Sequence, residues 1–319
     1  MRRALAVLAL SLLAFAAQAQ GWPAKPVKFI IPSGPGGTID PLSRFLADQY
    51  SKLFGQNFIT ENRPGAQGNT GIAAIAKAEP DGYTIGLAAS SMIAINPHVY
   101  RAMPYDPRKE LVGIVLIGDV PNILVVHPEV PVKTLAEFIA YAKANPDKLN
   151  FGSTGSGSSM HLAGELFKTI TGTTMTHVPY TVPADATRDL ISGRLQLMFQ
   201  LMTGIQAQVK AERVRPIAVL SEKRWPGLPE VPTTAEQGMA RLTSSVWFAV
   251  VAPQGVPQAV VERISTETNK LLADEDFRKR IQGLGAAPMG GTPADYRKLY
   301  DEDYARWAEV VKASGAKID

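Results

Sequence analysis

The stretch VKFIIPSGPGGTIDP, residues 27–41, joins an apolar run to a glycine-rich loop. The run Val27–Ile31 predicts a strand buried on both faces of a sheet. The glycines of residues 34–37 allow the backbone to turn its N–H groups toward a ligand. Asp40 is expected to cap the next helix, with Pro41 as its first residue. A strand that leads through such a loop into a helix is typical of α/β folds, which bind ligands at the carboxyl ends of strands.

A second loop of this kind, GSTGSGSS at residues 152–159, follows Asn150 and Phe151 and precedes a helix that begins near Met160. Ser158 or Ser159 is the expected cap. Both loops therefore present helix N-termini, whose unpaired N–H groups attract anions. Neither loop fits a P-loop or a G-x-G-x-x-G motif, so a carboxylate is a better candidate than a nucleotide. Each loop taken alone could also be only a tight, capped turn.

Short apolar runs alternate with amphipathic segments along the rest of the chain. Strands are predicted at residues 84–88, 114–117, 123–126, 195–199, 217–220 and 246–251. Apolar residues at helical spacing predict helices around residues 42–53, 135–142 and 160–170. This alternation predicts parallel α/β sheets with right-handed crossovers.

The composition excludes several classes of protein. A chain of 319 residues is long enough for two domains, and 45% hydrophobic and 19% charged residues are typical of a globular protein. Without cysteine there is no disulfide framework, thiolate metal site or thiol nucleophile. The four histidines lack metal-ligand spacing, and the net charge of +4 is scattered rather than clustered. We therefore predict no cofactor, no metal and no nucleic-acid partner.

The N-terminus has the pattern of a secretory signal peptide. Arg2 and Arg3 precede an uncharged apolar run at residues 4–17, and Ala17-Gln18-Ala19 is an A-x-A cleavage site. The sequence predicts export and cleavage after Ala19. An uncleaved anchor is the alternative, although the apolar run is short for a membrane span.

Short motifs along the chain resemble those of one family, the periplasmic solute receptors of tripartite tricarboxylate transporters (Bug family). The motifs, in order, are residues 26–32 (PVKFIIP), 35–37 (PGG) with Asp40, 61–66 (ENRPGA), 68–69 (GN), 80–84 (PDGYT), 96–97 (NP), 105–107 (YDP), 157–167 (GSSMHLAGELF), 177–180 (HVPY), 228–233 (LPEVPT) and 290–293 (GGTP). The resemblance runs from about Trp22 to the C-terminus.

The resemblance implies an α/β, two-domain periplasmic binding protein of the Venus-flytrap kind, type II-like, with two interdomain crossovers. We place these crossovers near Pro121–Asn122 and near Ser244–Trp247. Domain 1 would hold residues 20–122 and 245–319, and domain 2 residues 123–244. Family members bind small organic anions, mostly carboxylates, in the periplasm and deliver them to a membrane permease, without catalysis. A monomer is expected.

Carried over position by position, the ligand-binding residues would come from both domains. The expected set is Ser33, Gly36, Gly37, Thr38, Asp40, Ser90 and Ser91 in domain 1, and Ser153, Thr154, Ser156, Ser158, Ser159, Tyr180, Thr181, Val182, Phe199 and Gln200 in domain 2. Within this set Asp40 is expected mainly to cap its helix, because a carboxylate repels an anion. His161 is expected to pack or cap rather than to bind ligand.

Two departures from the family pattern bear on the ligand. Relatives usually carry a Lys-Gly pair after the tyrosine that corresponds to Tyr180, where this chain has Thr181 and Val182. Many carry an aspartate at Gln200, which would pair the ammonium group of an amino acid. The neutral, more apolar wall predicts an aromatic or longer-chain carboxylate, for example a phthalate-type acid. The two facing donor loops, one in each domain, suit a dicarboxylate. The alternative is that these apolar side chains simply lie in the core.

Two other functions remain open from the sequence. The protein could present its bound carboxylate to a sensor kinase, which would use the same closed state. It could also be a periplasmic hydrolase, although the chain has no G-x-S-x-G motif.

Overall fold

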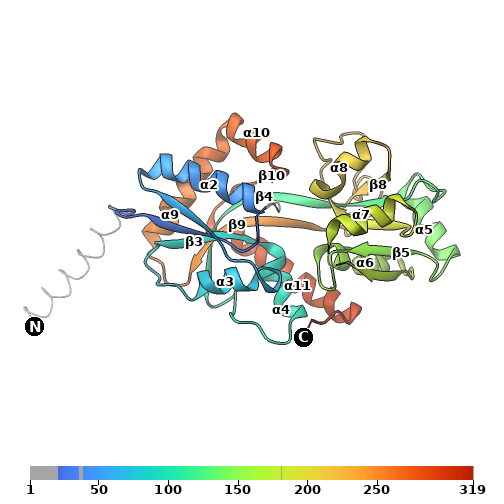
Figure 1. Ribbon diagram of the computed structural model, residues 1–319, viewed down its shortest axis with the longest axis horizontal. Coiled ribbons are helices and arrows are strands. Elements are labelled where there is room, and N and C mark those ends of the chain that lie inside the picture. Colours follow the sequence, from blue (N-terminus) through green and yellow to red (C-terminus); the bar gives the residue numbers. More distant parts are fainter. Residues whose placement is uncertain (1–20, 36–38, 181, 319) are drawn as a thin grey trace, which may run out of the picture.

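The computed structural model describes residues 21–35, 39–180 and 182–318, which form two lobes (Figure 1). The predicted signal peptide lies outside these residues, as do Gly36, Gly37, Thr38 and Thr181 of the predicted site. No described helix is both long and apolar enough to cross a membrane.

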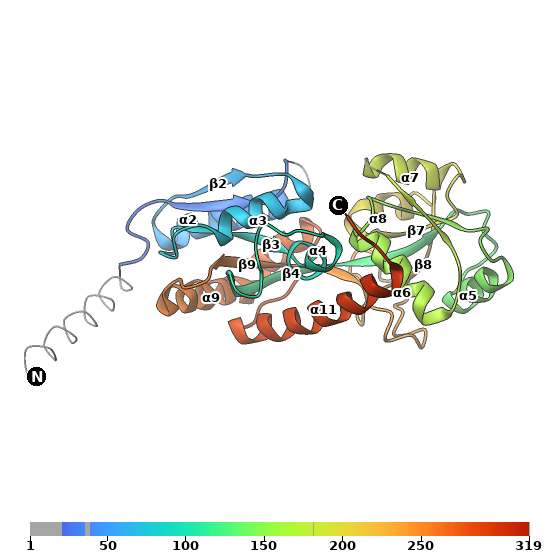
Figure 2. The ribbon, with the colours of Figure 1, turned by 90° about the horizontal axis from the view of Figure 1, so that it is seen from below.

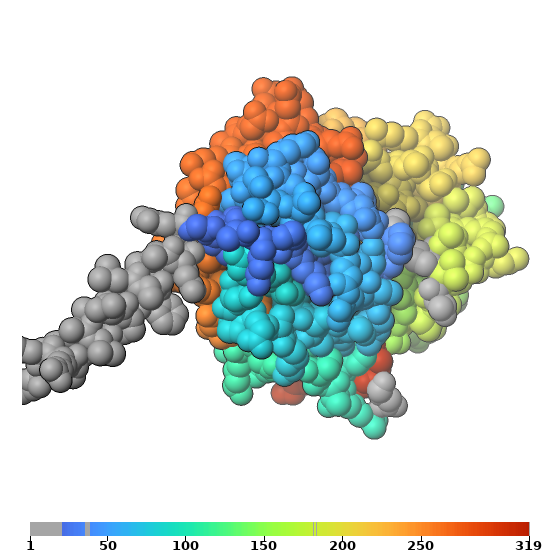
Figure 3. All heavy atoms as spheres, turned by 60° about the vertical axis from the view of Figure 1, so that its left-hand side comes forward, coloured from blue at the N-terminus to red at the C-terminus, as the bar shows by residue number. Residues whose placement is uncertain are grey.

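The first lobe is a sheet covered by helices on both sides. Its parallel strands are β1 (Val27–Ile31), β2 (Phe58–Asn62) and β3 (Thr84–Ala89). Its helices are α2 (Ile39–Phe54), α3 (Asn69–Ala76), α4 (Asn96–Val99), α9 (Gln258–Ala273), α10 (Glu275–Gly283) and α11 (Pro293–Ser314). Figure 3 shows the N-terminal segment (blue) beside the returning α9–α10 segment (orange). The Phe45 and Phe277 rings, 5.0 Å apart, join these two segments.

The second lobe repeats the arrangement with shorter strands. They are β5 (Asn150–Ser153), β6 (Thr176–Pro179), β7 (Leu197–Leu201) and β8 (Arg215–Val219). The helices are α5 (Leu135–Ala144), α6 (Ser159–Thr171), α7 (Pro183–Ile191) and α8 (Met202–Lys210). Strands β5, β6 and β7 are parallel. Because α6, α7 and α8 each follow one of these strands, all three helices begin at the same edge of the sheet.

Two long strands join the lobes, β4 (Leu111–Val126) and β9 (Ser245–Pro253) (Figure 1). They run antiparallel from the pair Leu111–Pro253 to the pair Pro121–Ser245, and from Asn122 onward β4 pairs instead with β7 and β8. The fully buried Asn122 donates to the Phe199 carbonyl at 3.0 Å and accepts from the Ser244 hydroxyl at 2.9 Å. The molecule is thus a two-domain α/β protein with two crossovers, while the domain boundaries given above remain a prediction.

Besides the two crossover strands, the last helix and the C-terminal residues make packing contacts between the lobes. Helix α11 packs against β4 in the first lobe and reaches α6 in the second (Figure 2). Beyond it, Ile318 pairs with Tyr100. A Cβ added at Gly157 would lie 2.6 Å from Val99 Cγ1 and 3.3 Å from Ile318 Cδ1. The loop before α6 therefore lies directly against the first lobe.

The predicted elements agree with the structure in part. The strand Val27–Ile31 is confirmed. The prediction of parallel sheets is wrong for the centre, where β4 and β9 run antiparallel to their neighbours. The separate strands predicted at residues 114–117 and 123–126 are one strand. The prediction that Asp40 caps its helix is also wrong, because α2 already begins at Ile39 and Asp40 lies in its first turn.

Candidate functional site

The loop between β5 and α6 presents a capped helix N-terminus. The predicted cap is confirmed as Ser158, whose hydroxyl accepts from the His161 N–H at 3.3 Å and donates to the Gly155 carbonyl at 2.8 Å. Gly155 and Gly157 have φ angles of 106° and 76°, which L-residues with a side chain rarely adopt. Glycine at these two positions therefore allows the loop to curl tightly around the start of α6.

A serine–histidine pair supports the base of this loop. Ser153 is fully buried, and its Oγ lies 2.6 Å from His177 Nε2 and accepts from the Gly155 N–H at 3.2 Å. Such a distance is typical of an activated nucleophile. The buried hydroxyl has no exposed surface to offer a substrate, so the geometry favours a structural role.

The His177 ring stacks on His161, with centroids 3.8 Å apart. Burial lowers the pKa of His177 from its ordinary 6.5 to about 4, and the neighbouring His161 acts in the same direction. His161 Nδ1 accepts from the Gly157 N–H at 3.0 Å, so its Nε2 carries the proton when the ring is neutral. As predicted, His161 packs inside the lobe and supports the loop.

Glu165 completes this buried cluster. Its carboxylate accepts two hydrogen bonds from Lys168 Nζ, at 2.9 and 3.0 Å, and lies 3.7 Å from His161 Nε2. Burial raises the pKa of Glu165, but the hydrogen bonds from His161 and Lys168 outweigh it, and the net shift is downward. Glu165 is therefore ionised at neutral pH and paired with Lys168.

In the first lobe, Asn62 connects the loop after β1 to helix α2. Its Nδ2 donates to the Ser33 carbonyl and to Asp40 Oδ1, both at 2.9 Å. Arg44, one turn further along α2, donates to Asp40 Oδ1 at 3.1 Å and to Asn62 Oδ1 at 2.6 Å. Asp40 thus holds the loop through Asn62 and Arg44, and its negative charge is offset by the guanidinium.

A neighbouring turn of the first lobe reaches across to the second. Residues 65–68 all have positive φ, including the non-glycine residues Ala66 and Gln67 at 45° and 51°. Such a conformation costs on the order of 1 kcal/mol or more per non-glycine residue, and it persists where the surroundings enforce it. Gln67 Nε2 makes a long hydrogen bond, 3.5 Å, to the Ser156 carbonyl in the second-lobe loop. Sequence reasoning noted this segment as a family motif but did not predict its role.

The remaining predicted residues lie in different surroundings. Ser90 is fully buried and accepts from the Trp247 N–H at 3.3 Å, which anchors β9. Tyr180 donates to Asp189 Oδ2 at 2.8 Å. Phe199 is fully buried, with its ring 5.4 Å from that of Phe167. Thr154 and Ser156 lie in the second-lobe loop, and Ser159 opens α6. Val182 directly precedes α7, and the buried Gln200 lies near the end of β7. Ser91 opens a π-helical turn in the first lobe.

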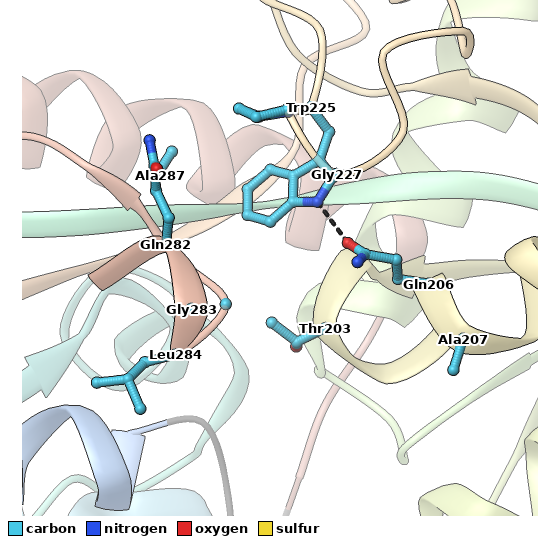
Figure 4. A pocket seen from close by; sticks show the side chains of 11 residues that line it. Thr203, Gln206, Ala207, Trp225, Gly227, Gln282, Gly283, Leu284 and Ala287 are labelled. Carbon is cyan, nitrogen blue, oxygen red and sulfur yellow. Dashed lines mark hydrogen bonds between the residues drawn. The ribbon is translucent and has the colours of Figure 1, made fainter. Parts of the chain in front are cut away.

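A cavity of about 570 Å³ lies between the two lobes at one side (Figure 4). Trp225 and Gln206, joined by a 2.6 Å hydrogen bond from Trp225 Nε1, line it from the second lobe. Gln282 and the backbone around Gly283 line it from the first. At its edge the lobes touch, since a Cβ added at Gly285 would lie 2.4 Å from Thr203 Cγ2. The lobes therefore touch in two places, at Gln67 and Ser156 and at Gly285 and Thr203.

The described residues contain no group of three or more His, Cys, Asp or Glu side chains that could hold a metal ion. In the second-lobe loop the polar groups are backbone N–H groups and hydroxyls, such as those of Ser153 and Ser158. Such donors suit an anion held by hydrogen bonds.

Comparison with known proteins agrees with this geometry. Residues 42–316 match the tripartite tricarboxylate transporter family receptor, TctC. The chain is 33% identical over 323 residues to Protein BugT of Bordetella pertussis, covering 100% of this chain and 99% of that protein. It also resembles the solved structure of R. palustris Rpa4515 with adipate, with a TM-score of 0.80, 37% identity and coverage of 93% and 100%.

A second solved structure is more distant. MatC from Rhodopseudomonas palustris with bound malate is 26% identical, with a TM-score of 0.75 and coverage of 91% of this chain and 100% of that one. Adipate and malate are both dicarboxylates. The chain therefore belongs to the tripartite tricarboxylate transporter receptor (Bug) family of periplasmic solute-binding proteins.

Proposed function

We propose that this protein is exported, loses its signal peptide after Ala19, captures a dicarboxylate between its two domains and delivers it to a tripartite tricarboxylate transporter permease. The observation that carries the proposal is the position of the capped α6 N-terminus. Its loop lies against the first lobe, with Gln67 at 3.5 Å from the Ser156 carbonyl. The second-lobe loop thus borders the first lobe, which supports a ligand held between the two domains.

The energetics are sufficient for such a ligand. A hydrogen bond to a charged group contributes about 1.5–3 kcal/mol. Micromolar affinity requires about 8 kcal/mol. A few such bonds at each carboxylate, together with modest burial, exceed the costs of association and domain closure.

Of the two ligand classes expected from the sequence, the dicarboxylate has more support. The aromatic proposal relied on an apolar wall that included Phe199, and this side chain is buried among core rings. The solved relatives with adipate and malate bind open-chain dicarboxylates. Donors at two separate loops fit such molecules without an aromatic wall.

Binding can be tested by thermal shift on protein purified from the periplasm and stripped of ligand by unfolding and refolding. We expect open-chain dicarboxylates to raise the melting temperature, with stabilisation of about 2.7 kcal/mol at a hundredfold excess over Kd. Phthalate and hydroxybenzoates should give smaller shifts. A larger shift with the aromatic acids would overturn the ligand class, and no shift with any carboxylate would overturn the proposal.

Delivery is tested separately in cells that lack the gene. Loss of uptake of the bound acid, restored by the intact gene, is the expected result. Normal uptake with lost induction of the genes for its metabolism would instead show a receptor that signals to a sensor kinase.

A further inference from the structure

The loop before α6 contacts the first lobe at two consecutive residues. Gln67 Nε2 donates to the Ser156 carbonyl at 3.5 Å. A Cβ added at Gly157 would lie 2.6 Å from Val99 Cγ1 and 3.3 Å from Ile318 Cδ1, so both side chains lie against the Gly157 backbone. We call the three first-lobe residues Gln67, Val99 and Ile318 the platform.

The same loop sets the geometry of the α6 N-terminus. The Gly157 N–H donates to His161 Nδ1 at 3.0 Å, and the Gly155 carbonyl accepts from the hydroxyl of Ser158, the cap of α6, at 2.8 Å. Ser156 and Gly157 lie directly between Gly155 and this cap. A displacement of either residue would therefore move the N–H groups to which the proposed function assigns the ligand.

The C-terminal segment is held in place by the first lobe. Gly315 ends α11 in a left-handed conformation, with a φ of 67°. The Ile318 N–H donates to the Val99 carbonyl at 2.9 Å, and the Ile318 carbonyl accepts from the Arg101 N–H at 3.2 Å. Ile318 thus pairs in parallel with Tyr100, and Figure 2 shows this segment beside α4 and α6. Ile318 and Val99 therefore form one apolar surface against the loop before α6.

The turn that carries Gln67 is fixed by amides of the first lobe. Asn96 Nδ2 donates to the Gln67 carbonyl at 3.4 Å and to Asn69 Oδ1 at 2.7 Å. The Tyr105 hydroxyl lies 3.0 Å from Asn69 Oδ1, and Asn69 and Asn96 are both buried. Helix α4 begins at Asn96 and ends at Val99, so one short helix supports both contacts with the second lobe. Because all of these hydrogen bonds lie within the first lobe, the platform keeps its shape when the lobes separate.

We propose that the platform consists of positioning residues, which seat the loop before α6 as the lobes close and so orient its N–H groups toward the ligand. The inference rests on the proposed function, because it concerns the support of the same anion site. Platform and loop touch only while the lobes are together. Loss of a platform contact therefore destabilises the closed, liganded state and leaves the open state unchanged. The result is faster dissociation of the ligand at a nearly unchanged association rate.

Stopped-flow mixing with succinate, malate and adipate, followed by tryptophan fluorescence, measures both rates. Trp225 lines the cavity between the lobes and is expected to report closure. Gln67→Ala and Ile318→Ala should each raise the dissociation rate about threefold, as expected for one hydrogen bond or a few apolar contacts. The double variant should reach about tenfold, and the association rate should stay within about twofold. Val99 stays unchanged because it is fully buried in the core.

Hydrogen exchange of the liganded protein gives a second measurement, which a general loss of stability would not reproduce. The amides of residues 157–161 should exchange faster in Gln67→Ala and in Ile318→Ala than in the unchanged protein. Those of helix α5, which lies in the same lobe away from the platform, should keep their protection.

Gln49→Ala and Ile170→Ala are the matched controls. Gln49 lies on α2 and donates to the neighbouring Asp48 at 3.2 Å. Ile170 is partly buried, as Ile318 is, but lies in the last turn of α6. Both controls should leave the dissociation rate unchanged.

Equal acceleration in a control, or an unchanged dissociation rate in the double variant, would overturn the positioning role and leave the proposed function standing. Failure of the unchanged protein to bind any of the three acids would overturn the proposed function, and this inference with it.

Discussion

Lowering the pH from 7 to 4.5 is expected to destabilise this protein through His177. Burial holds the pKa of this side chain at about 4 in the folded protein, against about 6.5 when unfolded. Between these values the unfolded chain binds the extra proton, so the free energy of unfolding falls as the pH falls. The loss should reach about 1–2 kcal/mol at pH 4.5, because solvent screens part of the shift of this partly buried side chain. Urea unfolding at several pH values measures it.

His177→Asn is the control for this prediction. It removes the titrating ring but keeps a side chain able to hydrogen-bond to Ser153. Its stability should vary less between pH 6.5 and 4.5 than that of the unchanged protein. Parallel pH profiles for the two proteins would contradict the assignment to His177.

At the scale of single residues, the sequence predicted which residues lie in the second-lobe loop better than it predicted their hydrogen-bond partners. Ser153 and Ser158 were predicted as part of the second loop, and Ser158 is the cap. The contact between Ser153 and His177 spans 24 residues and exists because β5 and β6 lie in register, which no local pattern reveals. Asp40 was wrongly predicted as a cap, because its hydrogen bond to Asn62 on β2 is not visible in the local sequence.

Among the elements, α6 is the one whose N-terminus is predicted to bind ligand. Ser158→Ala should cost about 1 kcal/mol of stability, as is usual for a lost N-cap. It should also weaken dicarboxylate binding severalfold, because the loop that presents the N–H groups loses its bond to Gly155. Urea unfolding and calorimetry measure the two effects on the same preparation.

Thr134→Ala is the matched control in this case. Thr134 caps α5 by accepting from the Glu137 N–H at 3.2 Å. The same loss of stability is expected, with unchanged affinity. If Thr134→Ala weakened binding as much as Ser158→Ala, the effect would come from general destabilisation rather than from the α6 loop.

Whether a strand was predicted correctly depended on how continuous its run of apolar residues is. Strand β1 was predicted to the residue, because four of its five residues are apolar and a proline follows it. Strand β4 was divided in two, because Asp119, Pro121 and Asn122 interrupt the apolar pattern. These residues remain in a strand because β9, β7 and β8 supply partners on successive stretches. Strand β6 was not predicted, since its four residues are all partly or fully exposed.

For the whole molecule, contact between the lobes at Thr203 should control closure. Thr203 is exposed on α8 and contacts Gly285 of the first lobe. A Cβ added to Gly285 would lie only 2.4 Å from Thr203 Cγ2. Thr203→Trp should hold the lobes apart and lower dicarboxylate affinity tenfold or more, while stability stays within about 0.5 kcal/mol. Small-angle scattering should show no decrease in radius of gyration on adding ligand.

Lys210→Trp places the same bulk at the other end of α8, on an exposed position. This variant should close on its ligand as the unchanged protein does. Normal closure and affinity in Thr203→Trp would show that the lobes approach each other elsewhere.

The paired strands β4 and β9 form a two-stranded ribbon that resists shear and allows bending. Their hydrogen bonds run across the strands, from the pair Leu111–Pro253 to the pair Pro121–Ser245. Sliding one strand past the other would break the whole ladder at once, whereas bending both together out of plane breaks none of it. The ribbon is therefore stiff in shear and compliant in bending. Opening and closing of the lobes by bending of this ribbon is reversible, because the elastic energy stored on bending is released when the ribbon returns.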